Sequence, residues 1–255
     1  MQRLFLTPSE IAESVINSGV KKANLRISQQ INLSILAGVY IAFGAQAANM
    51  LSHAINNPGL AKLLAGLIFP AGLIMVVLAG AELFTGNCLM IMSLSERRIT
   101  FTQLIKSWLI VYIGNFIGGL LIAYLIAKSG LLSEKLEIFT INIALVKINL
   151  SFMQAFIRGI LCNWLVCLAV WMSAGADDFT GKILAVFFPV CLFVISGFEH
   201  SIANMYYIPA AIFANSAVTW PEMFNNLLPV TLGNITGGAF FVGGIYWYCY
   251  ARKFY

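Results

Sequence analysis

Two apolar stretches of this chain, residues 60–94 and 182–213, are longer than one membrane crossing requires, and polar residues interrupt both. The interruptions read AELFTGN and FEHSIAN. A helix spans the hydrocarbon core with about 20 residues, and tilt extends this only modestly. At that depth each unpaired backbone N–H or C=O costs several kcal/mol. Each stretch is therefore predicted to be a broken helix whose irregular backbone is buried in protein or lines a polar cavity.

The whole chain has the composition of an integral membrane protein. Of its 255 residues, 60% are hydrophobic and only 10% are charged, whereas a soluble domain carries about 25% charged residues. The apolar runs have the length of helices and lack the alternation of barrel strands. We expect an all-α membrane protein with six transmembrane helices, the second and fifth of them broken, at 28–51, 60–94, 105–127, 152–173, 182–213 and 228–250.

The sequence also indicates two copies of a three-span unit. Glu82 and Asn87 correspond to Glu199 and Asn204, because each pair is 117 residues apart (199−82 and 204−87). The spans that follow carry GNFIGG and GNITGG, offset by 119 residues. Because three is odd, the second copy must cross the membrane in the opposite sense, which makes the repeats inverted. The predicted parts are a cytoplasmic amphipathic N-terminal helix at 1–27, a first repeat at 28–127, an outer connecting segment at 128–151 and a second repeat at 152–255.

The basic residues predict the orientation. With the N-terminus inside, ten of them lie on the cytoplasmic side and four outside, which favours two cytoplasmic termini. The inner set is Arg3, Lys21, Lys22, Arg26, Arg97, Arg98, Lys106, Lys182, Arg252 and Lys253, and the outer set is Lys62, Lys128, Lys135 and Lys147. Topology thus explains the net charge of +5 better than a nucleic-acid partner does.

The polar residues of the two breaks are suited to binding exposed backbone groups. We expect loop support from the matching carboxylates and carboxamides Glu82, Asn87, Glu199 and Asn204. Thr85 and Ser201 are expected to cap the half-helices, and Gly86 to permit unusual backbone angles. The GNxxGG motifs contain GxxxG, which lets helix backbones approach closely, so we interpret them as packing motifs.

His200 occurs in one copy only, because its counterpart at the 117-residue offset is Leu83. The repeated scaffold therefore does not require it. An ionisable residue at a helix break inside a membrane is a functional candidate, and imidazole exchanges protons near neutral pH. The alternative is a structural histidine that is satisfied by a neighbouring backbone group.

The sequence gives no support to catalysis, a metal site or a cofactor. The cysteines lie in apolar segments without metal-ligand or disulfide spacing, and we interpret them as packing residues: Cys88, Cys162, Cys167, Cys191 and Cys249. An intramembrane hydrolase would need a nucleophile and a base within reach. Ser201 and His200 are adjacent, and adjacent side chains on a helix do not face each other.

These motifs resemble those of the formate/nitrite transporter family of bacterial anion channels. The resemblance covers nearly the whole chain and rests on AELFTGN, GFEHSIANMYYIP, CNWLVCLAVWMS and GNITGG. Within the family it is greatest to the hydrosulfide-conducting channels of clostridia. It implies an aquaporin-like protomer, a homopentamer with one pore in each protomer, and a location in the bacterial inner membrane.

The resemblance also implies roles for individual residues. Thr85 and His200 would face each other at the pore centre, and Lys147 would lie in a vestibule on the outer side. The two constrictions would be formed by Phe69, Leu73, Leu83 and Phe84 toward one side, and by Asn163, Val166 and Phe193 toward the other.

The favoured hypothesis is a channel for small monovalent anions or their conjugate weak acids, namely hydrosulfide, formate and nitrite. Apolar constrictions oppose a bare charge. The anion therefore either meets the positive ends of half-helices or takes up a proton and crosses as a neutral acid. A proton-coupled secondary transporter stays open, because His200 would serve it equally well. So does an aquaporin-type channel for neutral solutes, although neither break contains Asn-Pro-Ala.

Overall fold

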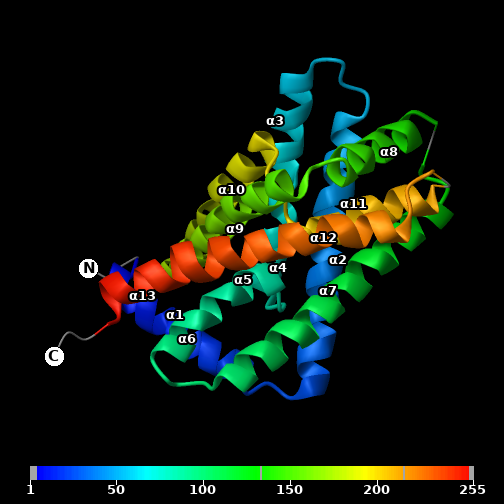
Figure 1. Cartoon of the computed structure of the whole chain (residues 1–255). Coiled ribbons are helices and arrows are strands. Elements are labelled where there is room, and N and C mark those ends of the chain that lie inside the picture. The colour runs from blue at the N-terminus through cyan, green and yellow to red at the C-terminus, as the bar shows by residue number, and fades with distance from the viewer. Residues whose placement is uncertain (1–4, 133, 215, 253–255) are drawn as a thin grey trace.

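The apolar runs form helices in the computed structural model, which describes residues 5–132, 134–214 and 216–252 (Figure 1). Arg3 and Lys253, which contribute to the predicted orientation, lie outside these residues. The elements in chain order are α1 (Pro8–Ala23), α2 (Ile27–Ser52), α3 (Pro58–Ile68), α4 (Pro70–Ala79), α5 (Phe84–Asn87), the 3₁₀ helix η1 (Cys88–Met90), α6 (Ile91–Ser95), α7 (Phe101–Lys128), α8 (Glu134–Ile148), α9 (Phe152–Gly175), α10 (Phe179–Ser196), α11 (Ser201–Phe213), α12 (Trp220–Ile235), the π-helix η2 (Thr236–Gly244) and α13 (Ile245–Tyr250). The described residues contain no strand.

Six helices are long and apolar enough to cross a membrane, as predicted. Most boundaries agree with the sequence to within a few residues, but the last span begins at Trp220 rather than at 228. Thr219 and Glu222 form a capping box there, and Pro221 occupies the first turn, so the local sequence starts the helix early. The same span is widened into a π-helix at η2.

The second and fifth spans are broken, which confirms the central prediction. Gly80 ends α4 and Gly197 ends α10, each in the left-handed conformation with φ of 79° and 70°. Glycine adopts this conformation without a steric cost, so it is suited to a helix C-terminus. A short extended segment follows each glycine before α5 and α11 begin.

The predicted details of the breaks were partly wrong. The residues at the N-caps are Leu83 and His200, whereas Thr85 and Ser201 lie inside the first turns. Gly86 has ordinary helical geometry, because the left-handed glycines lie at the preceding helix ends instead.

The glycines of the GNxxGG motifs bring helices into close contact, as expected. A Cβ on Gly118 of α7 would lie 2.1 Å from the Ile35 carbonyl oxygen of α2. In the other half, a Cβ on Gly233 of α12 would lie 2.2 Å from the Phe156 carbonyl oxygen of α9. Only glycine permits these backbone approaches, which fix where α2 crosses α7 and where α9 crosses α12.

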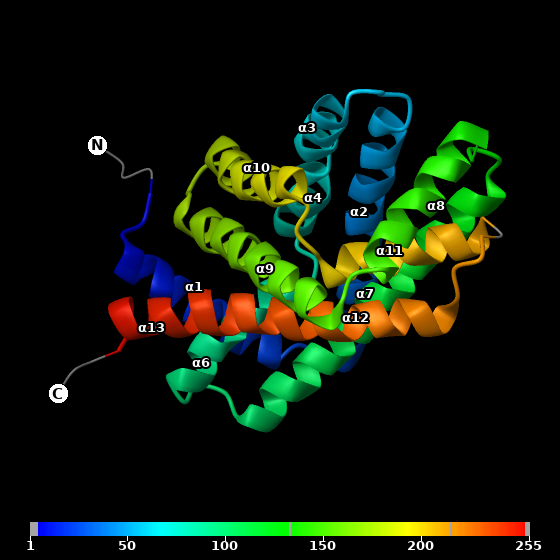
Figure 2. The ribbon, with the colours of Figure 1, turned by 45° about the horizontal axis from the view of Figure 1, so that its top comes forward.

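The two segments outside the predicted spans are helices that lie at opposite ends of the molecule (Figures 1 and 2). The first, α1, packs against η1, α6, α9 and α13, and α8 packs against α11, α12 and α2. The Ser93 hydroxyl donates to the Ile16 carbonyl at 2.7 Å, and Arg98 pairs with Glu13 at 2.7 Å, so α1 is held at both its buried and its exposed face. The Glu13 carboxylate raises the pKa of the Arg98 guanidinium. The predicted division into domains and the side of the membrane remain predictions.

Candidate functional site

The two breaks meet through Thr85 and His200, which are 115 positions apart in the sequence. The Thr85 Oγ1 atom lies 2.9 Å from His200 Nε2, and both residues are buried. Thr85 comes from the first turn of α5 and His200 precedes α11. The predicted juxtaposition of these side chains is therefore present.

The backbone determines the hydrogen-bonding roles of this pair. The Ala203 N–H donates to His200 Nδ1 at 3.2 Å, so Nδ1 is an acceptor. A neutral imidazole then carries its hydrogen on Nε2 and donates it to Thr85 Oγ1. The Thr85 hydroxyl hydrogen is consequently directed to another acceptor, which makes Thr85 a donor at the junction of the two breaks.

Asn115 of the first GNxxGG motif holds the first break. Its Oδ1 accepts the Phe84 N–H at 2.9 Å, and its Nδ2 donates to the Ser34 and Glu82 carbonyls at 2.7 and 2.9 Å.

Asn234 of the second motif does the same for the second break. Its Oδ1 accepts the Ser201 N–H at 2.9 Å, and its Nδ2 donates to the Gly159 and Glu199 carbonyls at 2.8 and 3.0 Å. The sequence pattern predicts only a packing role for these motifs. The asparagine that both copies share beside the glycines is the signal that indicates the second role.

The carboxylates of the breaks bind side chains rather than the backbone N–H groups we expected. Glu82 accepts from Asn87 Nδ2 at 2.7 Å and pairs with Lys22 Nζ at 2.9 Å. Lys22 also donates to Asn87 Oδ1 at 2.8 Å. Lys22 belongs to α1 and was not among the predicted site residues. Its neighbour Lys21 and the amphipathic pattern of α1 show a basic helix end, but not the position at which that helix docks.

The second break has the same arrangement. Glu199 accepts from Asn204 Nδ2 at 2.7 Å and pairs with Lys147 Nζ at 3.1 Å. Lys147 also lies over the Tyr207 ring, 5.2 Å from its centroid, and Asn226 donates to the Lys147 carbonyl at 2.8 Å. The Lys147 side chain is only 13% exposed, so it is a paired cation rather than a free one.

The residues predicted to form constrictions are buried and belong to one apolar cluster, apart from Asn163: Phe69, Leu73, Leu83, Phe84, Val166 and Phe193. The Phe69 and Phe193 rings are 5.6 Å apart, and Phe193 is 5.9 Å from the His200 ring. The structure thus places Phe69 beside Phe193, whereas the family resemblance implies a constriction that Phe69 shares with Phe84. The Phe84 ring instead packs against Tyr112 at 4.9 Å.

A cavity of about 140 Å³ lies between α1 and the first break. Ser14, Ser18 and Lys22 of α1 line one side, and Gly86 and Asn87 line the other. Lys22 therefore shares this cavity with Gly86 and Asn87, the two residues that follow Thr85 in α5.

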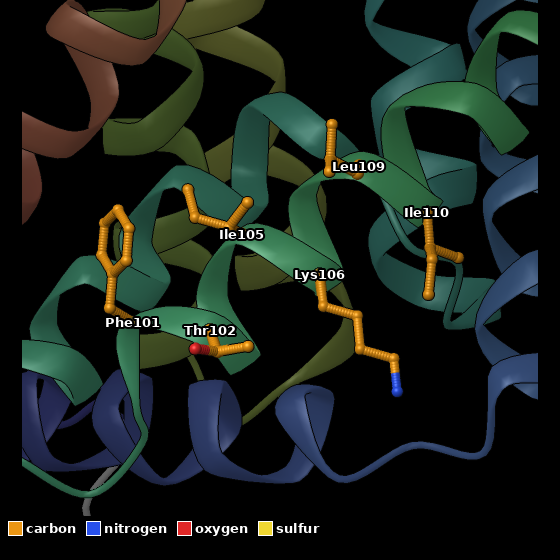
Figure 3. A pocket seen from close by; sticks show the side chains of 6 residues that line it. All are labelled: Phe101, Thr102, Ile105, Lys106, Leu109 and Ile110. Atoms are coloured by element: carbon orange, nitrogen blue, oxygen red, sulfur yellow. The ribbon is translucent and has the colours of Figure 1, made fainter.

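A larger hollow of about 460 Å³ lies on the outside of α7, away from this site (Figure 3). It is lined by Phe101, Thr102, Ile105, Lys106, Leu109 and Ile110. All six come from one helix, and none of them is a residue of the two breaks, so we do not assign this hollow to the functional site.

The described residues contain no group of three or more histidine, cysteine or acidic side chains placed to hold a metal ion. The five cysteines are free thiols.

Comparison with known proteins gives a consistent result. The sequence model of the formate/nitrite transporter family matches residues 9–248. A probable formate transporter of Methanothermobacter thermautotrophicus is 40% identical, with 98% of each chain covered. Among solved structures, an FNT family ion channel superposes with a TM-score of 0.89 at 30% identity, covering 94% of this chain and 98% of its own. A pentameric formate channel with formate bound has a TM-score of 0.79 at 35% identity, with coverage of 89% and 98%.

Proposed function

The chain belongs to the formate/nitrite transporter family, and from this premise we propose that it conducts hydrosulfide, formate or nitrite, as anions or as their conjugate acids, past the Thr85–His200 pair. Transport rather than enzymatic conversion is the activity of this family. The observation that carries the proposal is the direct contact between Thr85 Oγ1 and His200 Nε2, where the second halves of both broken spans begin.

The path begins and ends at the two lysines. Lys22 lies at the small cavity beside Gly86 and Asn87 of the first break, and Lys147 lies beside Glu199 of the second break. Each ammonium attracts an anion into a partly desolvated vestibule, while its glutamate limits the net positive charge so that the anion is released again. Conduction requires binding that is weak enough to permit departure.

Between the vestibules the substrate must pass the apolar side chains. Leu73, Leu83 and Phe84 form one constriction in this proposal, and Val166 with Phe193 and Phe69 forms the other. A bare anion pays a large desolvation cost there. An anion that takes up a proton from the aqueous solution at the vestibule crosses as its neutral conjugate acid, and the Thr85 hydroxyl offers it one hydrogen bond midway.

The assembly is proposed to be a homopentamer in the bacterial inner membrane, with both termini cytoplasmic. Support comes from the related structure described as a pentameric formate channel and from the ten-to-four division of basic residues.

Flux into liposomes that contain only this protein tests the proposal. Hydrosulfide, formate, nitrite, chloride and water are compared across pH, with empty liposomes as the control. We expect flux of the first three and little of chloride or water. Water flux without anion flux would favour the aquaporin-type alternative. Uphill accumulation of an anion with a coupling stoichiometry other than one proton per anion would favour the coupled transporter, because passage of the neutral acid itself carries one proton with each anion.

His200→Asn separates function from structure in the same assay. We expect an assembled protein of near-normal stability with a changed pH profile or anion preference, because the repeated scaffold has leucine at the matching position. Loss of assembly with unchanged residual flux would make His200 a structural histidine.

A further inference from the structure

The backbone carbonyl of Thr85 is held by two side chains of α9 that had no such predicted role. Asn163 Nδ2 donates to the Thr85 oxygen at 3.2 Å, and the Cys167 thiol donates to the same oxygen at 3.2 Å. The two residues are one helical turn apart, so a single face of α9 presents both donors. Both are fully buried.

Asn163 also connects the two breaks. Its Nδ2 donates to the Asn234 carbonyl at 2.6 Å, and Asn234 in turn binds the Ser201 N–H next to His200. The two hydrogens of the Asn163 amide are thus both used on backbone carbonyls. The Asn163 side chain thus links the Thr85 backbone, through Asn234, to the loop that carries His200. It does not present its N–H groups to a pore.

Gly238 in the π-helix leaves the space that this arrangement needs. A Cβ at Gly238 would lie 2.4 Å from Asn163 Nδ2, 2.7 Å from Cys167 Sγ and 2.8 Å from the Cys88 Cβ. Contacts this short require a neighbour to move, and the interior is packed too closely to absorb the shift without displacing one of the two donors.

We infer that Asn163 and Cys167 are positioning residues, which fix the orientation of the Thr85 hydroxyl toward His200 by holding the Thr85 carbonyl, and that Gly238 is required for both to reach it. The inference rests on the proposed function for its effect on transport, but the hydrogen-bond geometry is independent of that function. Asn163 then acts through Thr85 and not as a constriction residue in its own right. Cys167 acquires a role that the packing interpretation of the cysteines did not include.

The direct test is nuclear magnetic resonance of protein labelled with ¹⁵N-histidine. The chain has two histidines, so a His53→Gln background leaves His200 as the single signal. We expect the His200 Nε2 resonance to shift in Cys167→Ala and in Gly238→Ala, because the Thr85 hydroxyl moves relative to the ring. Cys167→Ser should restore the resonance, since its hydroxyl is also a donor. Cys162→Ala, which removes another buried thiol of α9, is the matched control and should leave it unchanged.

Flux supplies the second measurement. Loss of one hydrogen bond changes a rate or an equilibrium constant by about two- to tenfold. Cys167→Ala should therefore change the ratio of formate to hydrosulfide flux by about that factor. The change should disappear in a Thr85→Ala background, because the positioned hydroxyl is then absent. An Nε2 resonance that is the same in wild type, Cys167→Ala and Gly238→Ala overturns the inference, whatever the flux. A shifted resonance in a protein without anion flux supports the positioning role and rejects the proposed function instead.

Discussion

Asn234→Ala is the substitution that most directly tests how the breaks are held inside the membrane. The side chain pairs the Ser201 N–H and the Glu199 carbonyl, two groups at the irregular backbone of the second break. Its third bond, at 2.8 Å, is to the Gly159 carbonyl oxygen. This oxygen lies within α9, where the helix supplies a backbone N–H partner, so it depends less on Asn234. Asn234 is fully buried, so no solvent replaces these partners.

The expected loss follows from counting the groups left unpaired. Each buried donor or acceptor without a partner costs about 1–3 kcal/mol, so two of them cost about 2–6 kcal/mol. For a chain of this size 1 kcal/mol corresponds to about 2–4 °C, and we expect the apparent Tm to fall on the order of 10 °C. Asn115→Ala should have a similar effect, since Asn115 makes the matching bonds at the first break.

The measurement is thermal unfolding of the purified protein in one detergent at one scan rate, because membrane proteins commonly unfold irreversibly. Asn57→Ala is the control. It removes an exposed N-cap of α3 that accepts the Gly59 and Leu60 N–H groups, worth about 1 kcal/mol. If Asn234→Ala unfolds within about 2 °C of this control, the breaks are held by other contacts and the reasoning fails.

Three further predictions concern charge and topology. Lys147→Met should lower stability and anion flux at both low and high salt, because it leaves Glu199 as a buried, unpaired carboxylate that salt does not screen; a flux deficit that shrinks as salt rises would indicate long-range steering instead. Lys22→Met should reduce flux more than Lys21→Met, since only Lys22 reaches the first break and Lys21 is exposed; equal effects in the liposome assay would remove Lys22 from the path. A topology reporter fused after Lys253 should read cytoplasmic, and an external reading would overturn both the orientation and the inversion of the repeats.

The sequence predicted the broken spans because hydrocarbon imposes a strong constraint on backbone. Polar residues at 81–87 and 198–204 had to be satisfied by protein, and the recurrence of glutamate and asparagine at one offset indicated a shared design. The capping residues were misassigned because helix boundaries from sequence are uncertain by a residue or two. Gly80 and Gly197, at the ends of the preceding helices, carry the unusual backbone instead.

Contacts between distant segments were less accessible to sequence reasoning. The amphipathic pattern of α1 predicted a surface helix, but nothing in it indicated that Lys22 reaches Glu82. Likewise the order of residues along the chain separated Phe69 from Phe193, whereas the packing of α3 and α4 against α10 brings their rings together. Such pairings depend on how the helices cross. The sequence pattern locates the glycines at which helices approach each other, but it does not show which helices meet there or at what angle.

The positions of the two lysines indicate that the repeated unit is larger than the predicted three spans. Lys22 and Lys147 are 125 residues apart (147−22), and so are Ser34 and Gly159 (159−34), whose carbonyls accept the matching asparagine bonds. The helices that carry the lysines therefore keep register with the first span of each copy. On this basis we propose that α1 and α8 are the first elements of the two repeats, rather than a separate tail and a connecting segment. If the second copy is inverted, as an odd number of crossings requires, the same unit places one lysine–glutamate pair at each mouth of the proposed path.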